Sequence, residues 1–389
     1  MTDNAPRSRL VGFIATSVLV IVSVLLTLAV GEVGIRTAGF QPVFEVYSKP
    51  SLFWIHDELL GWSHQPSTQA TYVGPRPWPI EFETSISINS IGLRGPEIPP
   101  RQPDELRVLV LGDSKVAAFE VAYQDTFVYR LGRLLERRLN RPVTTINAGV
   151  RGYGTDQSYL YYRERGHVLQ PDVVIMIHSN NDPRNNITLH RMRRPFGKAA
   201  FALREDGALE LVGHPVPVYP ACSAWALDPN FQRVRRDDAK MRLACRLQMK
   251  FADHSAMFTF LALRIRQNPE LLKRLYRLGA PPPDPLRDGL ESRSRLTVEL
   301  FHRLQQAATG HGSRFAVLIS DWDLEEFDIE EMRARGIQTS QLSSAALEGV
   351  DPLSIQFKND SHYNEAGHEL VAELLEQVVL DMIANVPPA

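Results

Sequence analysis

The chain has little cysteine, almost no net charge and no repeated or low-complexity segment. Its 389 residues include only Cys222 and Cys245, and no Cys/His spacing is of the zinc type. A formal net charge of −2, without a basic tail, argues against nucleic acid as a partner. The glycines Gly149, Gly152 and Gly154 have the wrong spacing for a dinucleotide fingerprint, and no phosphate-binding loop is present. We therefore expect no metal and no organic cofactor.

Long apolar runs are also scarce, and the single one lies at the N-terminus. Residues 11–30 carry no charge, which is long enough to span a bilayer. Arg7 and Arg9 precede the run, so the positive-inside rule places residues 1–10 in the cytoplasm and the remainder outside. A cleaved signal peptide is the alternative, because residues 29–31 resemble a small-residue cleavage site. We expect an uncleaved anchor and a periplasmic or extracellular body, in which Cys222 and Cys245 are either a disulfide or two free thiols.

Short apolar runs rich in branched residues predict the buried parallel strands of an α/β domain. These runs are Leu106–Gly112, Val143–Ile146, Asp172–Ile177 and Arg314–Ile319. Ser114 follows the first run, a glycine-rich turn with Gly152 follows the second, and Asn181 follows the third. Since open α/β sheets bind ligands at the carboxyl ends of their strands, these residues are expected to gather at one edge.

The residue types at these positions are those that nucleophilic acyl transfer requires. Ser114 is the predicted nucleophile, and His362 is the predicted base because a neutral imidazole accepts a proton near neutral pH. Asp360 would orient His362, provided that the backbone turns between them. Oxyanion donors would be the Ser114 N–H, the Gly152 N–H and the Asn181 side chain. No Gly-x-Ser-x-Gly elbow is present, so the α/β-hydrolase version of this chemistry is unsupported.

These four blocks, in this order, resemble the SGNH (GDSL-type) hydrolase superfamily. They are Gly112-Asp113-Ser114, Gly152, Asn181-Asp182 and Asp360/His362. The Gly-Leu-Arg-Gly turn at residues 92–95 also resembles membrane-anchored bacterial members. The resemblance implies a three-layer, flavodoxin-like α/β fold with about five parallel strands. Two departures stand out: Asn359 occupies the usual position of the acid, and Ser179 stands where the third block usually has glycine.

The rest of the chain divides around this domain. Residues 31–104 are expected to be a connecting region with a strand at 80–88, in which Arg94 is a surface or structural arginine rather than an anion-binding one. Residues 105–389 form the hydrolase-like domain, and Asp125 is a reasonable N-cap for its first long helix. An insertion, residues 183–305, is interpreted as a cap over the active site. It is expected to contain a hairpin at 201–212 and helices at 237–252, 256–278 and 292–308. The acidic stretch 321–331 is read as a solvated helix or loop rather than a metal site.

Three functions fit these observations. The first is an extracytoplasmic serine esterase that removes an acyl group, such as acetyl, from a glycan or lipid through an acyl-serine intermediate. The second is an O-acyltransferase that acts on an envelope polysaccharide by the same intermediate. The third is a non-catalytic glycan-binding protein that keeps the SGNH fold.

Overall fold

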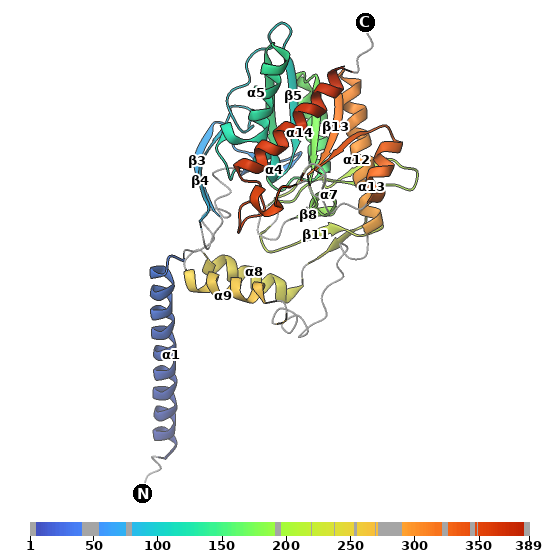
Figure 1. Ribbon diagram of the computed structural model, residues 1–389. Coiled ribbons are helices and arrows are strands. Elements are labelled where there is room, and N and C mark those ends of the chain that lie inside the picture. The colour runs from blue at the N-terminus through green and yellow to red at the C-terminus, as the bar shows by residue number, and fades with distance from the viewer. Residues whose placement is uncertain are drawn as a thin grey trace.

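A computed structural model shows a three-layer α/β body with one long N-terminal helix projecting from it (Figure 1). The structure describes residues 5–40, 54–74, 80–190, 196–218, 220–236, 238–252, 255–268, 270, 290–320, 326–342, 347 and 349–384. The C-terminal part of the helix expected at 256–278 and residues 321–325 of the acidic stretch lie outside these ranges.

The centre of the body is a five-stranded parallel sheet with the strand order β14-β13-β7-β5-β6. Its strands are β5 (Leu106–Gly112), β6 (Val143–Gly149), β7 (Val173–His178), β13 (Arg314–Ile319) and β14 (Gln338–Gln341). Numbered along the chain, this order is 2-1-3-4-5, the flavodoxin-like order. The predicted fold class is therefore confirmed. Strands β5 and β7 are buried along their whole length, as central strands covered on both faces must be.

Helices cover both faces of the sheet and bury two separate apolar clusters. Helices α5 (Phe127–Leu139) and α14 (Glu365–Ala384) pack on the face of β5 that carries Val108 and Val110. The opposite face is covered by α6 (Thr155–Tyr161), α12 (Leu290–Gly310) and α13 (Glu326–Ala334).

The predicted N-cap of α5 is wrong by one residue. Asp125 closes a short 3-10 turn, Tyr123–Asp125, and pairs with Arg130. Thr126 is the residue with the extended backbone that an N-cap needs, and its hydroxyl accepts from Tyr129 N–H.

The connecting region and the insertion add small antiparallel elements around the sheet. The connecting region contains β1 (Trp54–Asp57), β2 (Gly61–His64), β3 (Thr68–Gly74) and β4 (Phe82–Ile88). The insertion contains α7 (Asp182–Ile187), β8 (Thr188–His190), β9 (Ala200–Leu203), β10 (Leu209–Val212), β11 (Trp225–Leu227), β12 (Arg233–Arg235), α8 (Ala239–Ala252) and α9 (Ala256–Gln267). Shorter pieces are α4 (Ser114–Ala117), the π-helical turn Tyr162–Gly166 and the 3-10 turns His167–Leu169 and Pro352–Ile355. Strand β4 and the hairpin β9-β10 match the predicted strand and hairpin, and α8 and α12 match two of the predicted helices. The helix predicted at 256–278 is shorter than expected, because α9 ends at Gln267 and Asn268 leaves the helical conformation.

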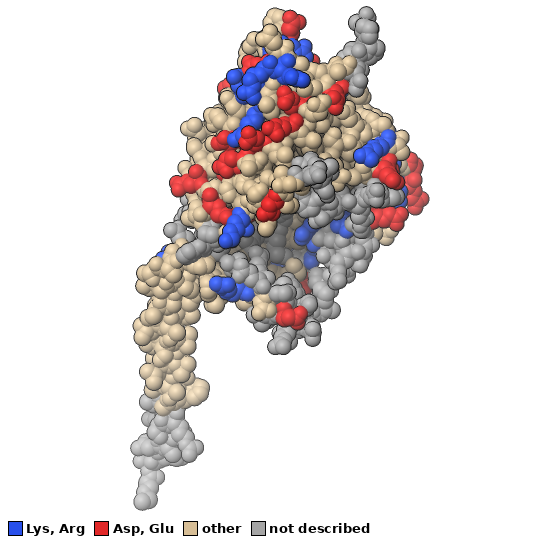
Figure 2. All heavy atoms as spheres, viewed as in Figure 1, with Lys and Arg blue, Asp and Glu red and all other residues tan. Residues whose placement is uncertain are grey.

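Helix α1 (Ala5–Thr37) accounts for the apolar run. Its segment Gly12–Thr37 is the single helix in the described ranges that is long and apolar enough to cross a membrane, a property that an N-terminal signal sequence shares. In Figure 2 the described part of α1 shows almost no Lys, Arg, Asp or Glu side chains, whereas residues of both charge signs are spread over the body.

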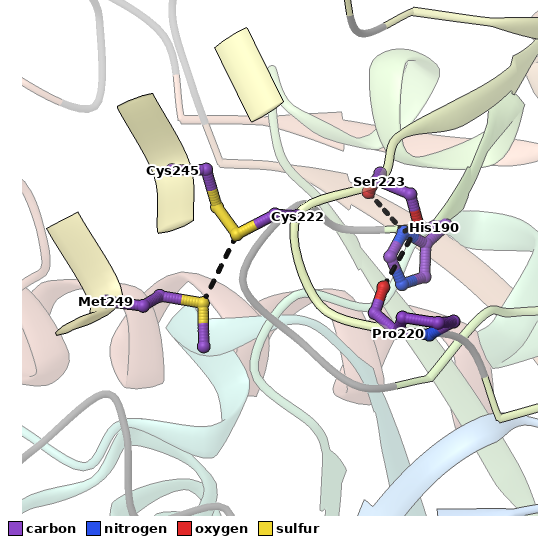
Figure 3. Close-up of a disulfide and its surroundings, with 6 residues drawn as sticks. All are labelled: His190, Pro220, Cys222, Ser223, Cys245 and Met249. Carbon is purple, nitrogen blue, oxygen red and sulfur yellow. Dashed lines mark hydrogen bonds between the residues drawn. A yellow bond between two sulfur atoms is a disulfide. The ribbon is translucent and has the colours of Figure 1, made fainter. Parts of the chain in front are cut away.

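The two cysteines form a disulfide, which settles the pairing that the sequence left open. It joins Cys222, before β11, to Cys245 on α8, with the Cα atoms 5.5 Å apart (Figure 3). Both residues are buried, and Cys222 Sγ also lies 3.5 Å from Met249 Sδ. The insertion is thus covalently closed upon itself.

Candidate active site

Ser114 stands at the carboxyl end of β5, as the first residue of α4. Gly112, two residues before Ser114, has φ +153°, and its neighbours leave no room for a side chain. A Cβ there would lie 2.6 Å from Val116 Cγ2 and 3.0 Å from Ile177 O. Asp113 then caps α4 by accepting from Lys115 N–H at 3.0 Å. The half-buried Ser114 side chain is therefore presented on a tight strand-to-helix turn.

Asp113 also accepts hydrogen bonds from polar residues that follow β7. Its carboxylate accepts from Ser179 Oγ at 3.2 Å and from Asn181 Nδ2 at 2.9 Å. Ser179, which departs from the usual glycine, thereby holds the turn that carries Ser114. Asn181 lies beside the same turn and is exposed. Because its amide has two N–H groups and one is used by Asp113, the second is available to a substrate oxygen.

The turn that contains Gly152 packs directly against the Ser114 turn. Val150 N–H donates to Gly112 O at 3.1 Å. A side chain on Gly149 would collide with the backbone of Ala117. Gly152 itself has φ +83°, in the left-handed region that favours glycine. The expectation that residues from different strands meet at one edge of the sheet therefore holds for the Ser114, Gly152 and Asn181 segments.

Asp360 and His362 are in contact although only one residue separates them. Asp360 Oδ1 accepts from His362 N–H at 2.9 Å and pairs with Nδ1 of the same ring. The backbone makes the turn that this contact needs, and it leaves Nε2 on the other side of the ring. Asn359, at the usual position of the acid, is used differently: its backbone N–H and amide bind Glu81 at 2.8 and 3.1 Å.

The loop with Asp360 and His362 is fixed against α4 by its other contacts. Lys115 Nζ lies 5.3 Å from the centre of the Tyr363 ring and donates to Ser320 Oγ at 3.1 Å. Tyr363 in turn donates to Ser320 O at 2.6 Å. Among the described residues no hydrogen bond joins Ser114 Oγ to His362. Catalytic hydrogen bonds often form only when substrate binds, so a serine–histidine pair does not require this bond in the free protein.

Glu120 is a site residue that sequence reasoning missed. Its Oε1 lies 3.5 Å from His362 Nδ1, its side chain is fully buried, and it forms an ion pair with Arg151. Its Oε2 has no hydrogen-bond partner in the described part of the chain. One signal was available in the sequence: Glu120 is a single charge between the apolar residues Phe119 and Val121.

The two carboxylates determine the charge state of the imidazole. Burial disfavours the charged ring, but the charge of Glu120 and the hydrogen bond and charge of Asp360 outweigh burial and Arg151. The pKa of His362 is therefore raised above 6.5. For Asp360, burial is outweighed by the hydrogen bond and charge of His362, and its pKa is lowered.

Glu120, Asp360 and His362 also bring their donor atoms within 4.8 Å of one another, a spacing that can hold a metal ion. A cation here would have to separate Glu120 from the Arg151 guanidinium and Asp360 from His362 Nδ1. The contacts present are those of a hydrogen-bonded, charge-paired imidazole. We therefore interpret the cluster as a proton-transfer group.

Arg94 is a structural residue, as expected. It is buried, and it donates to the carbonyl oxygens of Ala117 and Val121 at 2.6 Å each and to that of Ala118. Burial lowers its pKa to about 10, so it remains charged. The Gly-Leu-Arg-Gly turn thus holds the segment between Ser114 and Glu120.

Asp182 forms a second buried acidic group behind the site. It accepts from Ser179 N–H at 3.2 Å and lies 3.1 Å from His178 Nδ1. Burial, only partly offset by His178, raises the pKa of Asp182 to about 6. Asp182 opens α7 directly after Asn181, so this carboxyl holds the segment that presents the Asn181 amide.

No family model and no curated protein matches the chain. The solved structures to which it is similar include esterases, lipases and acylhydrolases. A two-domain esterase (CEX) active on acetylated mannans, co-crystallised with mannopentaose, is 12% identical over 73% of this chain, with a TM-score of 0.37. This chain spans 51% of that protein. A GDSL-like lipase from Bacteroides thetaiotaomicron is 10% identical over 73% of this chain and 93% of its own, with a TM-score of 0.34. An acetyl-xylooligosaccharide esterase, Axe2, studied as a mutant, is 9% identical over 70% of this chain and 93% of its own, with a TM-score of 0.35.

Proposed function

We propose that this chain is a serine esterase of the SGNH type. The observation that carries the proposal is the hydrogen-bonded Asp360–His362 pair, fixed against the turn that presents Ser114. The Gly152 and Asn181 segments supply oxyanion donors at the same edge of the sheet. Nucleophile, base, orienting acid and donors are the complete set that ester cleavage through a serine needs.

The reaction proceeds in two halves. Ser114 Oγ attacks the ester carbonyl while His362 Nε2 takes the hydroxyl proton, and the N–H donors of Ser114, Gly152 and Asn181 stabilise the oxyanion. The C–O bond to the alcohol then breaks, and the alcohol leaves with the proton from His362. In the second half a water molecule loses a proton to His362 and attacks the acyl-serine. The acid is released, and Ser114 regains its proton.

The proposed location is the extracytoplasmic face of a membrane, with α1 as an uncleaved anchor and residues 1–10 in the cytoplasm. Arg7 and Arg9 support this orientation. The Cys222–Cys245 disulfide supports an oxidising compartment. In Figure 1, α4 and α7 mark the carboxyl edge of the sheet, and this edge lies on the side of the body toward α8 and α9. A substrate near the membrane is therefore favoured: an acyl ester, such as acetyl, on an envelope glycan or a lipid.

A fluorophosphonate probe tests the proposal, because it reacts covalently with activated serines. The full chain in detergent is treated beside Ser114→Ala and His362→Ala, and Ser361→Ala is the matched control, since Ser361 is exposed and adjacent to the site. We expect labelling of the wild type and the control, and its loss in the other two variants. If a well-folded wild type is not labelled, the esterase proposal fails and a glycan-binding role replaces it. Wild-type protein that is labelled is then given an acyl ester together with a sugar. If the acyl group of that ester passes to the sugar faster than to water, the protein is an O-acyltransferase.

A further inference from the structure

Helices α8 and α9 expose large apolar side chains in regular stripes. On α8 these are Leu243, Leu247 and Phe251, which are 59%, 42% and 45% exposed and follow one another at intervals of four residues. On α9 the same interval separates Leu261 and Ile265, which are 50% and 36% exposed. Residues four apart lie on the same face of a helix. Each helix therefore presents a continuous apolar stripe to its surroundings.

Elsewhere in the described body, exposed large apolar side chains lie on separate elements and form no stripe along a helix, although Ile55, Ile91 and Val168 line one pocket. These exposed side chains are Ile55, Ile80, Ile91, Val168, Val218 and Leu353. Single exposed apolar side chains are ordinary on protein surfaces, whereas grouped ones mark interaction sites. Apart from α1, the α8–α9 pair is the part of the described surface where exposed apolar side chains repeat along one face of a helix.

This pair is attached to the end of α1. Glu32, on α1, accepts hydrogen bonds from the first residues of α9: Ser255 Oγ at 2.9 Å, Ala256 N–H at 2.8 Å and Met257 N–H at 2.9 Å. Residue 31 is a glycine at this contact, and a Cβ there would lie 2.8 Å from Met257 Sδ. Figure 1 shows α8 and α9 running across the axis of α1 beside its C-terminal end.

The length of the apolar run places this attachment at a defined depth. At 1.5 Å per residue, residues 11–30 span about 30 Å, the thickness of the hydrocarbon core. Glu32 is separated from this run by Gly31 alone. With α1 spanning the membrane over this run, the N-terminus of α9 would lie where the hydrocarbon ends and the lipid headgroups begin.

The other residues of α8 fit the same surroundings. Arg246 and Lys250 are exposed and flank the stripe of Leu243 and Leu247, and basic residues beside an apolar stripe are typical of interfacial helices. Cys245 lies on the opposite, buried side of α8. Its disulfide therefore ties the helix to the body without using the exposed face.

We propose that α8 and α9 lie along the membrane surface, with their exposed apolar stripes in the boundary between lipid headgroups and acyl chains. The partner is the lipid of the leaflet in which α1 ends. The helix pair then fixes the height and orientation of the body above the membrane, which a single spanning helix does not do. This inference rests on the proposed membrane span of α1 and is independent of the esterase chemistry.

Depth-dependent fluorescence quenching tests the placement. Single cysteines are introduced into the full chain with its disulfide intact, labelled with an environment-sensitive fluorophore and reconstituted in phosphatidylcholine nanodiscs. The lipids carry a nitroxide either near the headgroup or near the bilayer centre. Leu247→Cys reports on α8, and Leu243→Cys is the second probe of the same stripe. Ile21→Cys lies in the middle of the apolar run. Val168→Cys is exposed in the 3-10 turn that precedes the amino end of β7, and the amino ends of the parallel strands are opposite the edge that carries Ser114.

We expect the probes at Leu247 and Leu243 to be quenched at least twofold more by the shallow nitroxide than by the deep one. The Ile21 probe should show the opposite order, and the Val168 probe should be unaffected. If the α8 probes behave like Val168 while Ile21 is quenched, the anchor stands and the interfacial placement is wrong. Quenching of the α8 probes by the deep nitroxide also overturns it. If Ile21 is not quenched either, both the membrane span and this inference fail, and esterase labelling of Ser114 is left as a separate question.

Discussion

The buried ion pair between Glu120 and Arg151 provides the sharpest test of the site's electrostatics. The Glu120 side chain is fully buried and that of Arg151 is 7% exposed. The guanidinium also lies 5.1 Å from the ring centre of Tyr72 and 5.8 Å from that of Phe119. Replacing it in Arg151→Met keeps much of the apolar contact but leaves the Glu120 charge without its ion-pair partner, with His362 and the charge of Arg94 as the remaining positive groups.

The magnitude follows from the burial of the pair. Removing one partner of a buried ion pair costs about 3–5 kcal/mol, because the remaining charge is desolvated without compensation. For a body of this size, 1 kcal/mol corresponds to roughly 2 °C in Tm, so Arg151→Met should lower Tm by about 6–10 °C. Glu120→Gln combined with Arg151→Met removes both charges, and this double variant should recover most of the loss. The coupling energy between the two sites should therefore be about 3 kcal/mol.

Thermal unfolding of the full chain in detergent, followed by tryptophan fluorescence, measures all four members of this cycle. Trp62 is fully buried and donates to Arg151 O, so the signal reports on this region. The reasoning is refuted if the double variant is no more stable than Arg151→Met. That result would mean that Arg151 acts through packing, and that Glu120 carries no charge that needs a partner.

Three further predictions concern pH and the disulfide. Because the pKa of His362 is raised and only the neutral imidazole can accept a proton, the rate of ester hydrolysis should fall as pH decreases through a value above 6.5. Glu120→Gln should move this fall to lower pH. If pH–rate profiles with a soluble aryl acetate show no such displacement, the role of Glu120 is contradicted. The pKa of Asp182, about 6 in the folded state, exceeds its unfolded value near 3.9, so its favourable contribution to stability is complete below about pH 4 and is lost as pH rises through 6. Asp182→Asn should therefore reduce the loss of unfolding free energy between pH 4 and pH 7.5 by up to about 3 kcal/mol. If wild type and variant lose the same unfolding free energy between these two pH values, the prediction is wrong. Replacing Cys222 and Cys245 by serine opens a loop with a sequence separation of 23 residues, which should destabilise the insertion by about 3 kcal/mol; hydrogen exchange of the α8 amides should accelerate, and equal protection in both proteins would show that packing alone holds α8.

Local pattern was sufficient for the elements that position the site. The four runs that predicted strands are β5, β6, β7 and β13. For β5, β7 and β13 a continuous apolar segment was the signal, as a buried parallel strand requires, whereas the edge strand β6 was indicated by its β-branched residues. The fifth strand, β14, reads Gln338-Thr-Ser-Gln341 and was not predicted. It lies at the edge of the sheet and takes its conformation from pairing with β13 rather than from its own composition.

In the candidate site too, some residues could be predicted from local sequence, whereas the contacts between others depend on the tertiary structure. Ser114, Gly152 and Asn181 were predicted from their positions at strand ends, since parallel topology brings such ends to one edge. The sequence could not show that Asp360 reaches His362, because that contact depends on how the loop turns. Nor could it show Glu120 beside the imidazole.

The sequence by itself determined four strands of the sheet, the N-terminal apolar helix and the residues at the strand ends, because each is encoded within a short window of the chain. Tertiary structure alone decided the contacts between residues far apart in the sequence. Glu120 meets His362 across more than two hundred residues, Cys222 meets Cys245, and Glu32 caps α9. Such pairings depend on how the elements pack, and packing is decided by the whole core at once rather than by any local pattern.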